Sequence, residues 1–127
     1  MGWTSVSDFM VGDTTMAAVY EALDGLSARQ QASANNIANI ETPNFTAKRV
    51  DFESSLAQAA SSGDPSTMQL SVTPTTDAPR VDGNNVNLGD ETILAEKTGL
   101  QFQTMVDAMN AKFKLLNTAI SGSPGAG

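Results

Sequence analysis

The stretch TTMAAVYEALDGLSARQQASANNIANI, residues 14–40, decides the fold. Apolar side chains, interrupted in the middle by polar Gln30 and Ser33, recur in it at alternating steps of three and four residues, the spacing of an amphipathic helix with a coiled-coil seam. Asp13 or Thr14 can cap its start, and Pro43 is a firm stop. The sequence therefore predicts a long helix over residues 14–40 with a seam made of Met16, Val19, Leu23, Leu26, Gln30, Ser33, Ile37 and Ile40.

A second long helix is predicted over residues 90–121. Asp90 and Glu91 stand at its start, where the helix dipole favours negative charge, and Gly122 is a natural stop. A stripe with steps of four and three residues runs along this helix and is made of Phe102, Val106, Met109, Phe113, Leu116 and Ile120. A lone pair of helices leaves much of such stripes exposed, so we expect them to pack on each other or on neighbouring subunits.

The region between the helices has no long periodic pattern. Residues 41–52 indicate a turn followed by a short extended run, and residues 53–60 could form two helical turns. Residues 61–80 are rich in Ser, Thr and Pro, which predicts a mobile segment. Within it, residues 68–72 alternate in polarity as a short strand does. The Asp82-Gly83 step then predicts a turn before the second helix.

These elements give a mainly α fold class. We predict an antiparallel, coiled-coil-like hairpin of two long terminal helices, with an irregular, partly disordered middle that has room for short strands. The predicted divisions are a flexible N-terminus (1–13), a helix with its turn (14–60), a mobile segment (61–80), a turn with the second helix (81–122) and a tail (123–127).

Composition excludes several kinds of chemistry. The chain has no cysteine and no histidine, so it offers no disulfide, zinc–sulfur site or Ser-His-Asp triad. The formal net charge of −7 argues against a nucleic-acid partner, because binding phosphates needs clustered Lys and Arg. No run approaches the ~18 apolar residues that span a bilayer, and no basic, apolar leader follows Met1. We expect no cofactor, metal or small-molecule ligand.

Three asparagines near the end of the first helix are unusual, because asparagine competes for backbone groups and is a mediocre helix residue. Asn35, Asn36 and Asn39 lie within five positions. Their amides either bond to nearby backbone or another chain, or they are solvated at a fraying helix end. The chemistry of the residues alone leaves these alternatives open.

The string ANNIAN at residues 34–39, followed by Thr42 and Pro43, resembles the N-terminal signature ANNIANxxTPGY of flagellar rod, hook and hook-associated axial proteins. The Gly-Tyr of that family appears here as Asn44-Phe45. Asparagine is the next-best residue for positive φ, and phenylalanine keeps the aromatic ring but lacks the hydroxyl. The turn should therefore persist without any hydrogen bond from a tyrosine.

Further stretches are similar to the proximal-rod members of the flagellar basal-body rod family: RVDFE at 49–53, DGNNV at 82–86, LQFQ at 100–103 and FKLL at 113–116. The resemblance implies a structural subunit, exported unfolded without a cleaved signal peptide, that polymerises into the torque-transmitting periplasmic rod of the basal body. It also implies the partners: further copies of the chain, other rod proteins, the basal adaptor and the export apparatus.

If this reading holds, the functional residues are interface residues and the chain is not an enzyme. We expect the interface to comprise Leu23, Leu26, Asn35, Asn36, Ile37, Asn39, Thr42, Pro43, Phe45, Phe102, Val106, Met109, Phe113, Leu116 and Ile120. A non-polymerising coiled-coil adaptor or export-machine component shares the helices but leaves the asparagine signature unexplained. A carboxylate-based wall hydrolase would need an acidic pair about 5–9.5 Å apart in a cleft, for which the sequence offers no aromatic lining.

Overall fold

The computed structural model describes residues 6–121, with side chains described for residues 14–120. The chain is mainly helical and carries a long helix at each end, as predicted. In chain order the elements are α1 (Val6–Ala38), β1 (Lys48–Asp51), α2 (Glu53–Ser61), the 3₁₀ turn η1 (Pro65–Thr67), β2 (Ser71–Pro74) and α3 (Leu88–Ser121).

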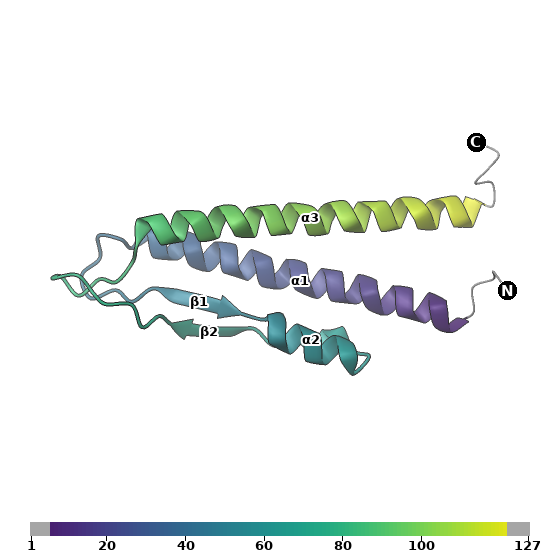
Figure 1. Ribbon diagram of the computed structural model, residues 1–127, viewed down its shortest axis with the longest axis horizontal. Helices are drawn as coiled ribbons and strands as arrows, with labels where there is room; N and C mark the ends of the chain where they lie inside the picture. Colours follow the sequence, from purple (N-terminus) through teal and green to yellow (C-terminus); the bar gives the residue numbers. More distant parts are fainter. Residues whose placement is uncertain (1–5, 122–127) are drawn as a thin grey trace.

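The helices α1 and α3 lie side by side and run in opposite directions (Figure 1). They are closest where α3 begins, and their axes diverge toward the ends of the chain (Figure 1). Burial agrees with this divergence, because the fully buried residues of α3, Glu91 and Thr98, both lie in its first third. The more distal part of α3 therefore has free surface.

The middle of the chain forms an arm, residues 48–74, that packs along α1 on the side away from α3 (Figure 1). In the arm, β1 pairs with β2 in antiparallel register, with Val50 opposite Val72. The helix α2 follows β1 directly and contacts both α1 and η1. The helix α1 consequently lies between α3 and the arm.

A small apolar core joins α1 to the arm. Its buried members are Ala22, Leu26, Val50 and Phe52, and partly buried Ala28, Ala32, Leu56, Met68 and Met105 surround them. Gly25 permits this contact, because a Cβ there would overlap the ring of Phe52. A helix position that normally favours alanine over glycine thus requires glycine here.

The helix boundaries differ modestly from the prediction. The first helix begins at Val6 and not at residue 14, because residues 6–13 contain no proline and the single Gly12 is tolerated inside a helix. The second helix begins at Leu88, two residues early. Its cap is Asn87, whose Oδ1 accepts a hydrogen bond of 3.0 Å from the amide of Asp90.

The middle contains more regular structure than predicted. The short helix expected over residues 53–60 is present as α2, and the extended run before it is β1. The strand expected over residues 68–72 lies slightly later, as β2, because its register is set by pairing with β1. The mobility expected of residues 61–80 stays a prediction, and the predicted tail, 123–127, lies outside the described residues.

Candidate assembly interface and the signature turn

The signature turn at the end of α1 is closed by its own side chains. The Asn39 amide donates to the carbonyl of Asn35 at 2.8 Å, and the Thr42 hydroxyl donates to Asn39 Oδ1 at 3.1 Å. The Thr42 backbone amide also donates to the Asn39 carbonyl at 2.9 Å. The last turn of α1 therefore satisfies its backbone locally.

Asn36 fixes the start of the arm on α1. Its side chain is completely buried. Its Oδ1 accepts from the amide of Lys48 at 3.0 Å, while its Nδ2 donates to the Lys48 carbonyl at 2.9 Å. The amide of Asn36 thus imitates a neighbouring strand for the first residue of β1. Of the alternatives for the signature asparagines, bonding to backbone of the same chain holds for Asn36 and Asn39.

A buried carboxylate, Glu91, connects α3 to α1 and β1. It accepts hydrogen bonds from Ser33 Oγ at 2.8 Å, Asn36 Nδ2 at 3.1 Å and the Arg49 guanidinium at 2.5 Å. The side chain of Glu91 is 0% exposed, so the charge is tolerable only because these donors and the Arg49 cation compensate it. We call Glu91, Ser33, Asn36 and Arg49 the Glu91 cluster.

The segment that leads into α3 is bonded to the turn that leaves α1. Buried Asn84 donates through Nδ2 to the carbonyls of Asn39 and Thr42, both at 2.8 Å. Neighbouring Asn85 accepts from the amide of Ala47 at 2.7 Å. The two asparagines therefore join stretches that are about 40 residues apart in sequence.

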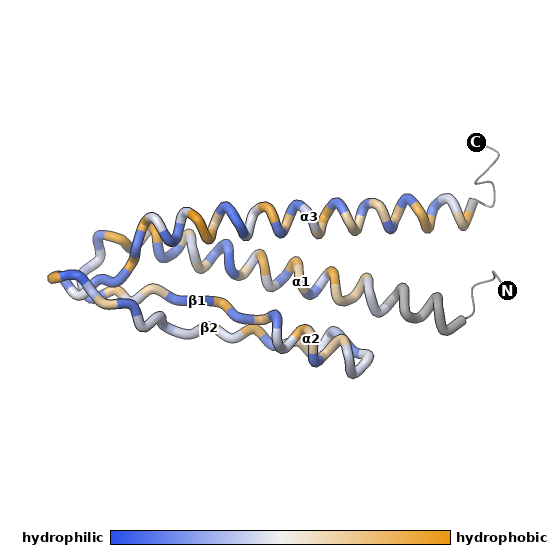
Figure 2. The backbone as a smooth tube through the Cα atoms, viewed as in Figure 1, coloured by the Kyte–Doolittle hydropathy of each residue, from blue (hydrophilic) through white to orange (hydrophobic). Residues whose placement is uncertain are grey.

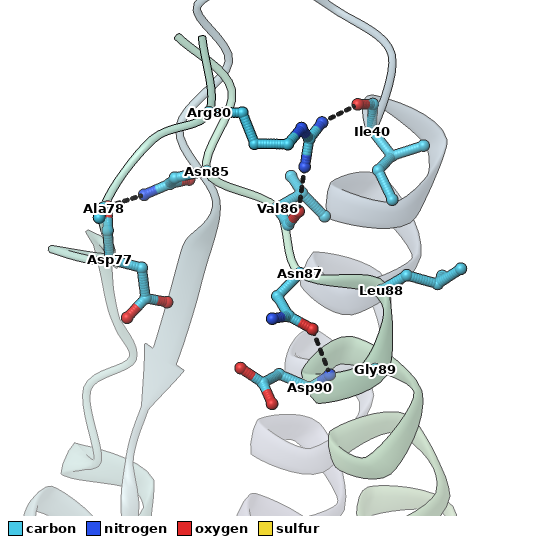
Figure 3. Close-up of a pocket in the computed structure, with 10 residues that line it drawn as sticks. All are labelled: Ile40, Asp77, Ala78, Arg80, Asn85, Val86, Asn87, Leu88, Gly89 and Asp90. Carbon is cyan, nitrogen blue, oxygen red and sulfur yellow. Dashed lines mark hydrogen bonds between the residues drawn. The ribbon is translucent and has the colours of Figure 1, made fainter. Parts of the chain in front are cut away.

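Arg80 also connects the turn after α1 with the segment before α3, as Figure 3 shows. Its guanidinium donates to the carbonyls of Ile40 and Val86, each at 2.6 Å. These groups border a hollow of about 610 Å³ that also reaches Asp77 and Asp90. The side chains of Arg80 and the capping Asn87 form their hydrogen bonds with backbone groups of the same chain. The polar groups around the hollow therefore hold the turn after α1 and the segment before α3 together.

The turn conformation expected of Asn44 is confirmed. Asn44 has φ +60°, in the left-handed region, and its amide donates to the Asp82 carbonyl at 2.9 Å. Gly83 faces it with φ +83°, and a Cβ at Gly83 would collide with the Asn44 side chain. Asn44 therefore replaces the family's glycine without loss of the turn.

A second ion pair ties α1 to the junction of β1 and α2. Both terminal nitrogens of Arg29 bond the carboxylate of Glu53 at 2.7 Å, and Arg29 also donates to the Val50 carbonyl. The guanidinium lies 4.8 Å from the ring centroid of Phe52. The hydrogen bonds between Arg29 and Glu53 lower the pKa of Glu53 to about 2. The same bonds raise the pKa of Arg29.

Sequence reasoning missed Glu91, Arg49, Arg29 and the bonding of Asn84 and Asn85. Each of them acts on a partner at least 21 residues away, so no local pattern marks it. One available signal was the polar pair Gln30-Ser33 in the middle of the apolar seam. Ser33 is buried and donates a hydrogen bond to Glu91, whereas Gln30 is exposed.

The expected interface residues fall into three groups by exposure. Within the single chain, Leu26 and Asn36 are buried, so they act inside the subunit. The half-buried group is Leu23, Ile37, Asn39, Phe45, Val106, Met109 and Leu116, and the exposed group is Asn35, Thr42, Pro43, Phe102, Phe113 and Ile120.

Apolar positions continue along α3 to its C-terminal end (Figure 2). Phe113 is 42% exposed and Ile120 is 82% exposed, although both belong to the predicted stripe. Pairing of the two stripes along their full length therefore does not occur within one described chain. Coiled-coil packing of the distal halves stays a prediction.

Among the described residues, no group of three or more Asp or Glu side chains is placed to hold a metal ion. None of the described helices is both long enough and apolar enough to cross a membrane.

Two long terminal helices, joined through an asparagine-based turn that is bonded to the segment before the second helix, define a mainly helical protein whose turn carries the sequence signature that resembles flagellar axial proteins. No family model matches the chain. The flagellar basal body rod protein FlgB of Bacillus subtilis (strain 168) is 30% identical over 121 residues, covering 85% of this chain and 94% of that protein. The FlgB proteins of Escherichia coli (strain K12) and Cereibacter sphaeroides (strain ATCC 17023) are 28% and 30% identical over 87% and 80% of this chain, and the alignments cover 96% and 90% of those proteins. The chain belongs to the FlgB family of flagellar basal body rod proteins.

Proposed function

We propose that this chain is a structural subunit of the flagellar proximal rod and polymerises through its terminal helices. The exposed apolar stripe on the distal half of α3 carries this proposal. Removing a side chain such as Phe113 or Ile120 from water contributes about 1.5–3 kcal/mol when burial is complete. A stripe of this kind, repeated on every copy, can drive association.

The charges of the two helices support packing between their distal halves. The first 28 residues contain acidic side chains but no Lys or Arg. Beyond Asp107, α3 carries Lys112 and Lys114 and no acidic side chain. Opposite charges beside apolar stripes favour one helix pairing over others, whether the two helices belong to one copy or to neighbours.

The polar contacts between the elements are suited to a subunit that transmits torque. The Glu91 cluster ties α1, α3 and β1 together, and the pair Arg29–Glu53 ties α1 to α2. A load applied to the arm would therefore be passed to both long helices, with little independent movement of the elements. In this role the chain is a mechanical part and not an enzyme, and it requires no cofactor, small molecule or nucleic acid.

The proposal also places the chain among partners. We infer that it resides in the basal body, in the periplasmic part of the rod, after export from the cytoplasm. Its neighbours would be further copies of itself, other rod proteins and the adaptor at the rod base, with the export apparatus as an earlier partner. The family to which the chain belongs supports this assignment.

The test is the association state and helicity of the purified chain against concentration, by light scattering with far-ultraviolet circular dichroism. We expect association without a fixed stoichiometry, and helicity that rises with it as the distal halves of α1 and α3 find partners. A monomer or dimer unchanged over a hundredfold range of concentration would overturn polymerisation and favour a non-polymerising adaptor.

A further inference from the structure

The turn between β2 and α3 presents a large apolar side chain to solvent. Val81 is 109% exposed, the largest value among the large hydrophobic side chains that the structure describes. Charged residues flank it, Arg80 before and Asp82 after, and their side chains are 47% and 42% exposed. We call residues 80–83 the tip turn. The segment containing it forms the end of the molecule opposite the C-terminal end of α3 (Figure 1).

The tip turn is held by a dense set of hydrogen bonds. The Gly83 amide donates to the Arg80 carbonyl at 2.9 Å, and the Arg80 amide donates to the Asn84 carbonyl at 2.8 Å. The Asp82 carboxylate accepts from the Asn84 amide at 3.0 Å. Because this conformation is already formed in the single chain, Val81 can bind a partner with little further loss of conformational entropy.

A hollow of complementary character lies on α3. It has a volume of about 470 Å³ and is lined by apolar Ile93, Leu100 and Met105, with Glu96 and Lys97 beside them and Gln101 and Thr104 further along. Ile93 and Leu100 are both more than half exposed. Leu100 lies nine residues from buried Glu91, which is about 180° around the helix. Ile93 and Leu100 therefore lie on the face of α3 that points away from α1 and from the stripe of Phe113, whereas Met105, at the other edge of the hollow, packs against the apolar core.

We propose that the tip turn of one copy docks into the α3 hollow of a second copy, with Val81 against Ile93 and Leu100. The charges can pair across the contact: Arg80 and Asp82, which lie 3.9 Å apart and are about half exposed, can face Glu96 and Lys97, which lie beside the apolar floor of the hollow. The inference rests on the proposed function, since it names a second copy as the partner.

This contact joins two different patches, so it does not close on itself. A head-to-tail contact of this kind generates a ring or an open filament, whereas a contact between identical patches stops at a dimer. Leu100 lies 12 residues into α3, about 18 Å from the helix start. Neighbouring copies would therefore be staggered along their long axes, as in an extended array.

Disulfide cross-linking tests the contact cleanly, because the chain contains no cysteine of its own. The double variant Val81→Cys/Leu100→Cys is oxidised at a concentration where the unmodified chain associates. Bridged cysteines require Cα atoms about 4.4–6.8 Å apart, and a bridge within one copy would leave a monomer, so only a contact between copies gives linked species. We expect a ladder of linked dimers, trimers and longer species. An equimolar mixture of the two single variants should stop at a dimer.

The matched control replaces another exposed valine. Val72→Cys/Leu100→Cys should form no ladder, since Val72 lies on β2, away from the tip turn. Association by light scattering without a ladder in the Val81 variant, or a covalent dimer from Val81→Cys alone, would overturn the docking while leaving the proposed function intact. Absence of association at every concentration would overturn both.

Val81→Asp provides the second measurement. The change leaves the backbone bonds of the tip turn in place but puts a charge on the docking side chain. We expect Val81→Asp to raise at least tenfold the protein concentration at which light scattering begins to increase. The control Val72→Asp should begin to associate at a concentration close to that of the unmodified chain. Equal behaviour of the two variants would contradict the docking.

Discussion

At the scale of single residues, Glu91 and Arg49 are unequal members of one ion pair. Glu91 is completely buried, whereas the Arg49 side chain is 31% exposed and can still reach water. Removal of the cation would leave a buried carboxylate with only two neutral donors. Removal of the charge on Glu91 would leave a cation that can turn to solvent. The cost of the two changes should therefore differ.

We expect Arg49→Met to lower the free energy of unfolding by about 3–5 kcal/mol, the usual cost of leaving a buried charge unpaired. Glu91→Gln keeps the shape and some of the hydrogen bonds, so we expect a smaller loss. Urea unfolding at a protein concentration below the onset of association measures both. A larger loss for Glu91→Gln than for Arg49→Met would contradict the burial argument.

The Arg29–Glu53 pair makes a prediction about pH. Glu53 ionises with a pKa of about 2 in the folded chain, against an ordinary value of 4.5. The pair therefore stabilises the fold fully above pH 4.5, and the contribution is lost as the pH falls from there through 2. Because the Glu53 side chain is 59% exposed, solvent screens the pair, and we expect about 1 kcal/mol or less at neutral pH.

The measurement compares the unmodified chain with Glu53→Gln by urea unfolding at pH 7, 4.5, 3 and 2. The difference in unfolding free energy should be constant above pH 4.5 and shrink toward zero near pH 2. A difference that stays constant down to pH 2 would show that the lowered pKa of Glu53 is not linked to folding.

At the scale of elements, two helix glycines have opposite roles. Gly25 of α1 lies against the Phe52 ring, so Gly25→Ala would overpack the contact between α1 and the arm. Gly99 of α3 faces Gln30, where an added Cβ would meet the side-chain nitrogen at an ordinary 3.6 Å. The same substitution should therefore have opposite signs in the two helices.

We expect Gly25→Ala to destabilise by about 1–3 kcal/mol through overpacking. Gly99→Ala should stabilise by about 0.5–1 kcal/mol, the usual gain in a helix interior. Thermal unfolding followed by circular dichroism distinguishes them. Stabilisation by Gly25→Ala would mean that α1 and the arm separate easily in solution.

The long helices could be predicted because a periodic pattern more than twenty residues long leaves little choice of structure. The elements of the arm were predicted in outline, but their pairing was not, since β1 and β2 have four residues each and their register depends on pairing with each other and on Asn36. The same contrast holds at the turn. Asn44 was predictable from its own conformational preference, whereas Glu91 depends on a partner 58 residues away.

At the scale of the whole molecule, association should depend on the stripe of α3. We expect Phe113→Asp to abolish the rise of scattering with concentration, because an unpaired charge would be buried in the interface at a cost of several kcal/mol. The fold of the single chain should persist, since Phe113 is already 42% exposed.

Ala108→Asp is the matched control. It introduces the same charge into an exposed position of the same helix, about 140° around from Phe113. We expect it to associate as the unmodified chain does. Equal loss of association in both variants would point to destabilisation of the helix. Association that persists in both variants would show that the stripe is not part of the interface.

The bonds between the two ends of the chain also determine when folding can finish. The donors Ser33 and Asn36 meet their acceptor, Glu91, only at sequence separations of 58 and 55 residues, and Asn84 closes the α1 turn at a separation of 42 or more. Contacts of such long sequence separation form late and slowly, because the loop must close before any of them contributes. A chain that emerges N-terminus first would carry α1 with an unsatisfied polar face until α3 follows. The subunit can therefore finish folding only after the segment from Asn84 to Glu91, which lies about two thirds of the way along the chain, has arrived.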